Sequence, residues 1–363
     1  MTQNQADFQK RLTNLRQQFS AWKIEALLVT NATNRRWLSG FTGSAGKLLI
    51  TPEKAWLATD SRYWEQAQQE APHFTLYKDF RRFTDTAEFI RQAGVTRVGL
   101  EAQDITLAVA RSLHQIEEIE WIPLDAPIDP LRQIKTEWEL EKICQAAAIA
   151  DEAMARVPQL AKVGMTEEAL AWELEKFMRE HGAESVAFPI IVASGPNSAR
   201  PHHRPGKRPL QPGDVLLVDL GAQVDGYKSD MTRTFFVAYM PEGPISEVYE
   251  LVLSAVTAVL DNLKPGLTGA EADALARTLI DVSGYGEYFG HGLGHGVGLD
   301  IHEGPGLNSR AQKEQLAAGA VVTVEPGIYL PGVGGVRIED LVLLTDSGCK
   351  LLSQFPKEAQ IVG

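Results

Sequence analysis

Residues 215–235 read VLLVDLGAQVDGYKSDMTRTF, and this stretch decides the fold of the second half of the chain. Two runs typical of β-strands flank Asp225-Gly226, a dipeptide that favours the type I′ turn of a tight hairpin. With these two residues as the loop, Val224 faces Tyr227, and counting outward places Asp219 opposite Thr232. The sequence therefore predicts a hairpin whose register is set by its turn.

The same register predicts where two carboxylates of the hairpin lie. Asp230 is two residues from Thr232, so its side chain emerges on the face of Asp219, roughly 7–8 Å away along the diagonal. Burying a bare carboxylate in an apolar strand costs several kcal/mol, and a second negative charge nearby raises that cost. Either one of these side chains points outward to solvent, or both face a shared cation.

A glycine-rich segment further along the chain carries histidines. Residues 290–303 read GHGLGHGVGLDIHE, which places His291, His295 and His302 among alternating glycines. Glycine allows close backbone approach but disfavours a helix, so we do not expect His291 and His295 to bind zinc as a helical pair. The glycine spacing does not match a phosphate-binding loop with its terminal lysine. The segment is either a flexible loop with surface histidines or a source of metal-binding imidazole.

Two more acids accompany apolar runs near the C-terminus. Glu325 follows a run of β-branched residues, and Glu339 lies inside a second strand-like run; Pro331-Gly332 and Gly334-Gly335 between them predict a hairpin. A lone strand glutamate is usually a solvated edge residue, but two in one hairpin, beside the other motifs, indicate a shared site. Four carboxylates and an imidazole are many ligands for one ion but are suitable for two. Oxygen ligands with a histidine nitrogen suit Mn²⁺, Co²⁺ or Zn²⁺. Paired ions of this kind generate hydroxide and polarise a carbonyl, as in aminopeptidases.

Composition and charge argue against several other classes of protein. The formal net charge is −12, whereas phosphate binding needs a basic face, so we expect no nucleic-acid partner. The first ten residues are polar and lack the apolar stretch of a secretory signal. No run approaches the roughly 18 apolar residues that a membrane span requires. The sequence therefore predicts a cytoplasmic protein without a membrane partner.

The chain is long enough for two domains. Strand-like runs at 26–29, 47–50 and 55–58 alternate with helical ones, which predicts an α/β domain at the N-terminus. Two prolines within 125–130 predict a linker, because proline does not continue a helix. We place the domains at residues 1–127 and 128–363.

A short stretch of the second domain recurs within it. Lys162-Val163-Gly164-Met165-Thr166 resembles Lys264-Pro265-Gly266-Leu267-Thr268, and each follows a helical segment and opens another. Thr268 and Glu271 also form a plausible capping box. The repeat predicts two similar halves about a pseudo-two-fold axis, although chance is a fair rival explanation for so few matched positions.

At these residues the chain resembles the pita-bread metallopeptidases, and within them the Xaa-Pro branch of aminopeptidase P and prolidase. The resemblance runs from about Ile134 to the C-terminus and rests on five separated motifs in the same order. It implies an α/β creatinase-like N-terminal domain and an α+β pita-bread catalytic domain. It also implies a homodimer that hydrolyses the Xaa-Pro bond at the N-terminus of proline-containing peptides.

The resemblance assigns roles to individual residues. Two divalent ions, Mn²⁺ or Co²⁺ in preference to Zn²⁺, would be held at the five ligand positions of the family, Asp219, Asp230, His295, Glu325 and Glu339. Catalytic roles fall to His202, His302 and Glu325, and positions near the substrate to His291 and Arg337. His203 stands where prolidase-like members commonly have glycine, so it is the alternative to His202.

Two rival interpretations share this fold. A creatinase-like amidinohydrolase has the same two-domain plan but does not need the complete two-metal set. A binding module of the histone-chaperone or growth-regulator kind typically loses ligands. All five ligand positions are filled here, which favours the peptidase. The sequence does not separate aminopeptidase P, which accepts longer peptides, from prolidase, which prefers dipeptides.

Overall fold

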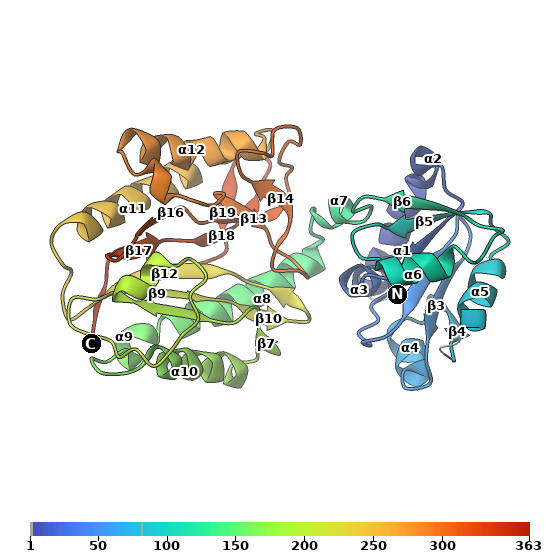
Figure 1. Ribbon diagram of the computed structural model, residues 1–363, viewed down its shortest axis with the longest axis horizontal. Coiled ribbons are helices and arrows are strands. Elements are labelled where there is room, and N and C mark those ends of the chain that lie inside the picture. Colours follow the sequence, from blue (N-terminus) through green and yellow to red (C-terminus); the bar gives the residue numbers. More distant parts are fainter. Residues whose placement is uncertain (1–2, 81–82) are drawn as a thin grey trace. The chain divides into compact units, whose positions relative to one another are not determined.

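A computed structural model of the chain describes residues 3–80 and 83–363, and the chain forms two compact units, 1–132 and 133–363 (Figure 1). The first unit is built on a six-stranded sheet of order β4-β3-β2-β1-β5-β6. The three strands predicted for this domain are all present, as β1, β2 and β3. Its strands are β1 (Ala26–Val29), β2 (Lys47–Ile50), β3 (Ala55–Thr59), β4 (Thr75–Lys78), β5 (Arg97–Glu101) and β6 (Glu120–Leu124).

Helices accompany this sheet, as the α/β prediction requires. They are α1 (Gln3–Gln17), α2 (Phe19–Trp22), α3 (Ala32–Ser39), α4 (Trp64–Glu70), α5 (Phe83–Arg91), α6 (Leu107–Leu113) and α7 (Asp129–Arg132). The short helix α7 begins inside the stretch expected to be a linker. Pro130 stands in its first turn, where the missing N–H has no helical partner to lose.

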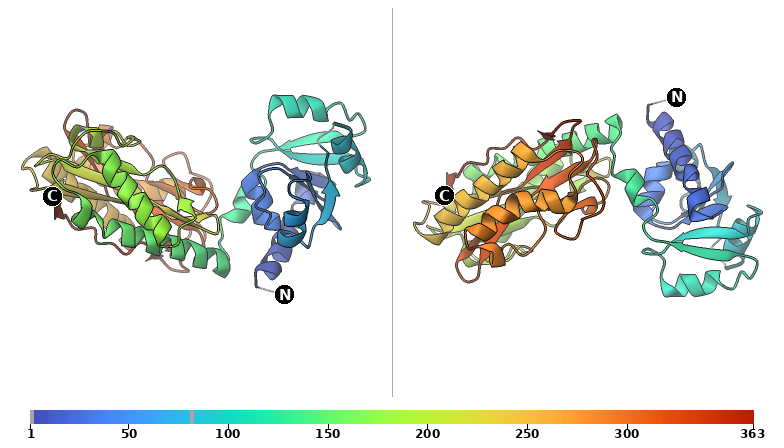
Figure 2. Two further views of the ribbon diagram at one scale, coloured as in Figure 1. Left: turned by 90° about the horizontal axis from the view of Figure 1, so that it is seen from below. Right: turned by 90° about the horizontal axis from the view of Figure 1, so that it is seen from above.

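The second unit places its strands between helices on two sides (Figure 1). Figure 2 shows the helices of one side from below and those of the other from above. On one side lie α8 (Glu137–Met154), α9 (Val157–Leu160) and α10 (Glu167–Glu180), and on the other α11 (Pro244–Asn262) and α12 (Gly269–Val282). Each side has its own apolar core, one packed under α8 and α10 and the other under α11 and α12.

The strands of this unit form several small sheets. One has the order β20-β12-β9-β8 and another the order β14-β13-β15-β18-β19, while β16 pairs with β17 and β10 lies between β11 and β7. The bounds are β7 (Ser185–Val186), β8 (Ile191–Ser194), β9 (Val215–Leu220), β10 (Ala222–Val224), β11 (Tyr227–Lys228), β12 (Met231–Val237), β13 (Gly294–Gly296), β14 (Glu303–Leu307), β15 (Val321–Val324), β16 (Gly327–Leu330), β17 (Gly334–Arg337), β18 (Asp340–Leu344), β19 (Cys349–Leu351) and β20 (Ile361–Val362).

The repeated stretch has the same local structure in both halves. Gly164 and Gly266 have φ of 87° and 92°, a conformation that glycine adopts readily. Thr166 caps α10 and Thr268 caps α12, the latter in the predicted capping box with Glu271. The backbone N–H groups of the two glycines donate to the carbonyls of Leu210 and Leu316. The predicted relation between the two halves is therefore confirmed at these elements.

The hairpin has the predicted register. Val224 pairs with Tyr227 and Asp219 with Thr232. Asp225 and Gly226 have φ of 49° and 80°, the positive values that a type I′ turn requires. This turn therefore sets which residues of β9 and β12 share a face.

The predicted C-terminal hairpin is also present, as β16 and β17, but one placement was wrong. Glu339 does not lie inside a strand: it stands between β17 and β18, as Glu325 stands between β15 and β16. Each acid therefore lies where the chain leaves one sheet and enters another. In the described part of the chain, no helix is both long and apolar enough to cross a bilayer.

Candidate metal centre

Five separate segments of the second unit bring the predicted ligand residues together. Asp230, His295 and Glu339 each offer a ligand atom, and these atoms lie within 4.8 Å of one another. Nε2 of His295 lies 3.4 Å from Oε1 of Glu325 and 3.7 Å from Oδ2 of Asp230. The alternative in which one acid of the hairpin points to solvent does not hold, since Asp219 and Asp230 are both buried.

Asp219 joins this cluster through Arg337. Nη2 of Arg337 donates to Oδ2 of Asp219 over 2.6 Å, and its Nε donates to Oγ1 of Thr232. Thr232 in turn donates to Oε2 of Glu339 over 2.7 Å. The second oxygen of Asp219, Oδ1, is buried and has no hydrogen-bond partner among the described residues.

The carboxylates of the site are buried and repel one another, and both effects shift their pKa values. Burial raises the pKa of the Asp230 carboxyl well above its usual value, and the charges of Glu339 and Asp219 raise it further. Burial and the same kind of repulsion raise the pKa of Glu339, and burial raises the pKa of Glu325 to about 7. Burial lowers the pKa of His295 to about 4, so its imidazole is neutral near pH 7. Neutral imidazole is the form that binds metal.

These residues fit divalent metal. An unpartnered buried oxygen such as Oδ1 of Asp219 costs free energy unless something binds it. Arg337 balances only part of the charge of the four carboxylates, and a cation would neutralise the rest. Carboxylate oxygens with one imidazole nitrogen are ligands of Mn²⁺, Co²⁺ and Zn²⁺.

Two of the predicted catalytic histidines lie beside this cluster. The ring of His302 stands edge-on to that of His295, with centroids 4.3 Å apart. His202 and His302 both line the cavity over the acids. His203, the alternative to His202, instead bonds through Nε2 to Oε2 of Glu167 over 2.8 Å.

His291 lies in the cavity wall with both ring nitrogens in use. Nδ1 lies 2.8 Å from the carbonyl oxygen of Gly292, so Nδ1 carries the hydrogen. The hydroxyl of Tyr329 accepts from Arg337 and therefore donates to Nε2 of His291, 2.9 Å away. Its substrate contact stays a prediction, but its hydrogen bonds make it the end of a chain that leads to Asp219.

The cavity has a volume of about 930 Å³ and belongs to the second unit. Its lining combines the acids and histidines with an apolar part, Phe188, Pro189, Ile191 and Phe289, and with the cations Arg204, Arg277 and Arg310. Ligand sites of small molecules and short peptides commonly have this size and this mixture of surfaces. Sequence patterns gave no functional role to Thr232, Tyr329 or Glu167, since their contacts with Glu339, His291 and His203 join segments that are far apart in the chain.

Buried carboxylates and imidazole at one wall of a peptide-sized cavity define a metal-dependent hydrolase. Comparison with known families identifies this one: residues 141–346 match metallopeptidase family M24, and residues 11–134 match the creatinase/prolidase N-terminal domain. The chain belongs to metallopeptidase family M24, with the creatinase-type N-terminal domain and the pita-bread catalytic domain that the resemblance implied.

Relatives of known name match nearly the whole length of the chain. The Xaa-Pro dipeptidase of Pyrococcus horikoshii is 38% identical over 339 residues, 92% of this chain and 94% of that protein. The Xaa-Pro dipeptidase of Bacillus anthracis has a similar structure, with a TM-score of 0.95 and 40% identity over 98% of this chain and 100% of that one. The X-Pro aminopeptidase of Thermotoga maritima has a TM-score of 0.89 and 37% identity, covering 97% and 99% of the two chains.

Proposed function

We propose that the chain hydrolyses the bond between an N-terminal residue and a following proline, with two divalent ions bound by Asp219, Asp230, His295, Glu325 and Glu339. The observation that carries this proposal is the convergence of Asp230, His295 and Glu339, with Glu325 beside His295. The neighbouring Asp219 adds a buried oxygen without a hydrogen-bond partner among the described residues. Relatives named for Xaa-Pro substrates match the chain over nearly its full length. Mn²⁺ or Co²⁺ is the expected metal, as the resemblance implies.

The bound ions would supply a nucleophile near neutral pH and polarise the scissile carbonyl. Glu325 would accept a proton and pass it to the leaving proline nitrogen; burial raises its pKa to about 7, which supports this role. His202 and His302 line the cavity beside the acids and would stabilise charge on the carbonyl oxygen. The apolar part of the wall suits a proline ring.

The test compares two acids of one hairpin. Asp230→Asn removes a charged ligand, whereas Asp225→Asn changes an exposed turn residue to one that also tolerates positive φ. With Mn²⁺- or Co²⁺-loaded protein, we expect Asp230→Asn to abolish turnover of an Xaa-Pro dipeptide and to weaken metal binding in calorimetry. Asp225→Asn should keep both. Full activity of Asp230→Asn would refute the metal assignment.

Substrate length is decided in the same assay. An Xaa-Pro dipeptide and an Xaa-Pro-Xaa tripeptide are offered side by side, because relatives of both kinds match the chain. Preference for the dipeptide identifies a prolidase, and preference for the tripeptide an aminopeptidase P. Turnover of creatine with neither peptide cleaved would favour the amidinohydrolase instead. The homodimer and the cytoplasmic location stay predictions from the resemblance and the sequence.

A further inference from the structure

A buried carboxylate outside the metal centre holds the loop that carries His202. Glu167, the first residue of α10, has a relative exposure of 0%. Its Oε1 accepts from the backbone N–H and the hydroxyl of Ser194, both at 2.8 Å, and from Asn197 at 3.0 Å. Its Oε2 accepts from Nε2 of His203 at 2.8 Å and from the N–H of Gly206 at 3.2 Å.

These donors come from both limbs of one loop. Ser194 and Asn197 lie on the limb that leaves β8, and His203 and Gly206 lie on the returning limb. His202 lies between them, in a turn where the N–H of His203 donates to the carbonyl of Arg200. A single carboxylate therefore ties the two limbs together on either side of His202.

The Glu167 carboxyl stays charged in this environment. Burial alone would raise its pKa, but hydrogen bonds from Asn197, His203 and Ser194 bring the pKa below its usual value. Hydrogen bonds to a charged acceptor are stronger than neutral ones, so the loop is held firmly.

The two adjacent histidines have different surroundings. The His203 ring bonds to Glu167, whereas the His202 ring makes no hydrogen bond to a described residue and lines the cavity that also contains the acids. His202 is thus left unbonded in the cavity wall while its neighbour is anchored.

We propose that Glu167 and His203 are positioning residues that aim His202 at the reacting peptide. This inference rests on the proposed function, in which His202 stabilises the carbonyl oxygen. Misplacing a catalytic group by about 1 Å can cost 10²-fold in rate, so a loosened loop would lower kcat without altering the metal centre. His203 thereby gains a role distinct from that of His202.

Glu167→Gln tests the proposal with little change in size. An amide has one acceptor atom, so donors on one limb of the loop lose their partner. We expect kcat for an Xaa-Pro dipeptide to fall on the order of ten- to hundredfold, with metal affinity unchanged. Glu168→Gln, an exposed neighbour on α10, should keep kcat.

A double-mutant cycle separates positioning from a general structural effect. If Glu167 acts through His202, Glu167→Gln should lower kcat by less than about twofold when His202→Ala is already present. An equal loss in both backgrounds would overturn the inference. His203→Asn, at the cavity edge, repeats the cycle if Glu167→Gln fails to fold.

An NMR measurement that does not depend on catalysis tests the positioning role separately from the proposed function. In Zn²⁺-loaded protein with ¹⁵N-labelled histidine, Glu167→Gln should shift the ring resonances of His202 and leave those of His302 in place. Unshifted His202 resonances would overturn the positioning role. Absence of wild-type cleavage of Xaa-Pro peptides would overturn the function, while the spectra would still decide the positioning role.

Discussion

Arg337 donates a 2.6 Å hydrogen bond to Asp219, and both side chains are buried. The guanidinium takes one oxygen of the carboxylate and leaves the other, Oδ1, without a partner among the described residues. It also reaches Thr232 and Tyr329, so one cation organises the acids and, through Tyr329, His291. The charge of Arg337 offsets part of the cost of burying Asp219, although burial still leaves the pKa of this carboxyl raised.

Arg337→Met should therefore destabilise the metal-free protein and strengthen its affinity for cations. Removing one partner of a buried ion pair costs about 3–5 kcal/mol, and the freed Asp219 charge would attract metal more strongly. Thermal unfolding and Mn²⁺ calorimetry measure the two effects. Arg204→Met, an exposed cation of the same cavity, should cost less than about 0.5 kcal/mol. Unchanged Mn²⁺ affinity in Arg337→Met would contradict this account.

The close approach of β13 to β15 predicts a second effect on the metal centre. A Cβ on Gly294 would lie 2.0 Å from the carbonyl oxygen of Thr323, so Gly294→Ala must displace the strand that carries His295. We expect metal affinity to fall at least tenfold, about 1.4 kcal/mol. Gly290→Ala is the matched control, because a Cβ there meets nothing within 4 Å. Equal metal binding by both variants would show that the tight contact is not required.

Local patterns were sufficient for the elements that bear the ligands. The Asp225-Gly226 turn fixed the pairing of Asp219 with Thr232, because a two-residue loop leaves no freedom of register. The recurring stretch ending in Thr166 and Thr268 indicated two related halves, because each copy needs the same cap and the same glycine φ.

Contacts between distant segments were not predictable in this way. Glu167 and His203 are separated by 36 positions, and Arg337 and Asp219 by 118. No periodicity or turn chemistry links such residues, so only the tertiary fold shows that His203 is anchored. The placement of Glu339 inside a strand failed for a related reason. Its apolar run continues through a change of sheets, and hydrophobicity alone does not mark that change.

The first unit supplies a prediction on pH. Burial raises the pKa of Glu101 above 4.5, so the fold favours its protonated form, despite donors such as Asn31 and Asn34. The carboxyl therefore contributes stability below about pH 4.5 that is lost as pH rises through its folded pKa. Relative to Glu101→Gln, wild type should lose protection against amide exchange in β1 as pH rises above about 4.5.

Glu25 is the matched control, because its shift has the opposite sign. Hydrogen bonds from the backbone N–H groups of Thr96 and Arg97 lower its pKa. Its contribution is present above about pH 4.5 and is lost as pH falls through the folded pKa. The difference between wild type and Glu25→Gln should therefore grow with pH. Parallel profiles for the two variants would contradict the opposite signs assigned to the two shifts.

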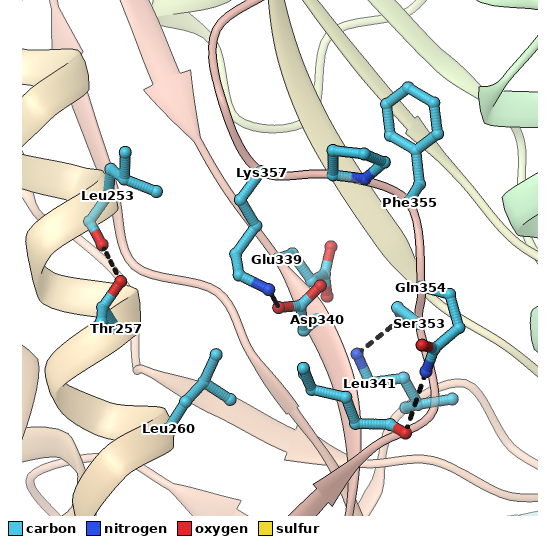
Figure 3. A network of polar contacts seen from close by, with 12 residues as sticks. Leu253, Thr257, Leu260, Glu339, Asp340, Leu341, Ser353, Gln354, Phe355 and Lys357 are labelled. Atoms are coloured by element: carbon cyan, nitrogen blue, oxygen red, sulfur yellow. Dashed lines mark hydrogen bonds and ion pairs between the residues drawn. The ribbon is translucent and has the colours of Figure 1, made fainter.

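The last prediction concerns Asp340, the first residue of β18, and its effect on stability and on metal affinity. Glu339 contributes to the metal centre, while its neighbour Asp340 pairs with Lys357 (Figure 3). Asp340 is fully buried and also pairs with Arg233. Arg233 also donates to the backbone carbonyls of Thr232 and Glu339, directly behind the acids. Asp340→Asn leaves the buried guanidinium of Arg233 without its counter-ion, so the free energy of unfolding should fall by about 3–5 kcal/mol.

Lys357→Met should cost far less than Asp340→Asn, about 1 kcal/mol or below, because the Lys357 side chain is 21% exposed and Asp340 keeps Arg233. Urea unfolding of the two variants measures this difference. The metal centre should respond in the same way. Asp340 holds the Arg233 guanidinium in place, and Arg233 in turn hydrogen-bonds the backbone carbonyl of Glu339. Metal affinity should therefore fall in Asp340→Asn and persist in Lys357→Met. Equal losses of stability in the two variants would mean that the ion pair with Lys357, rather than burial beside Arg233, holds this strand.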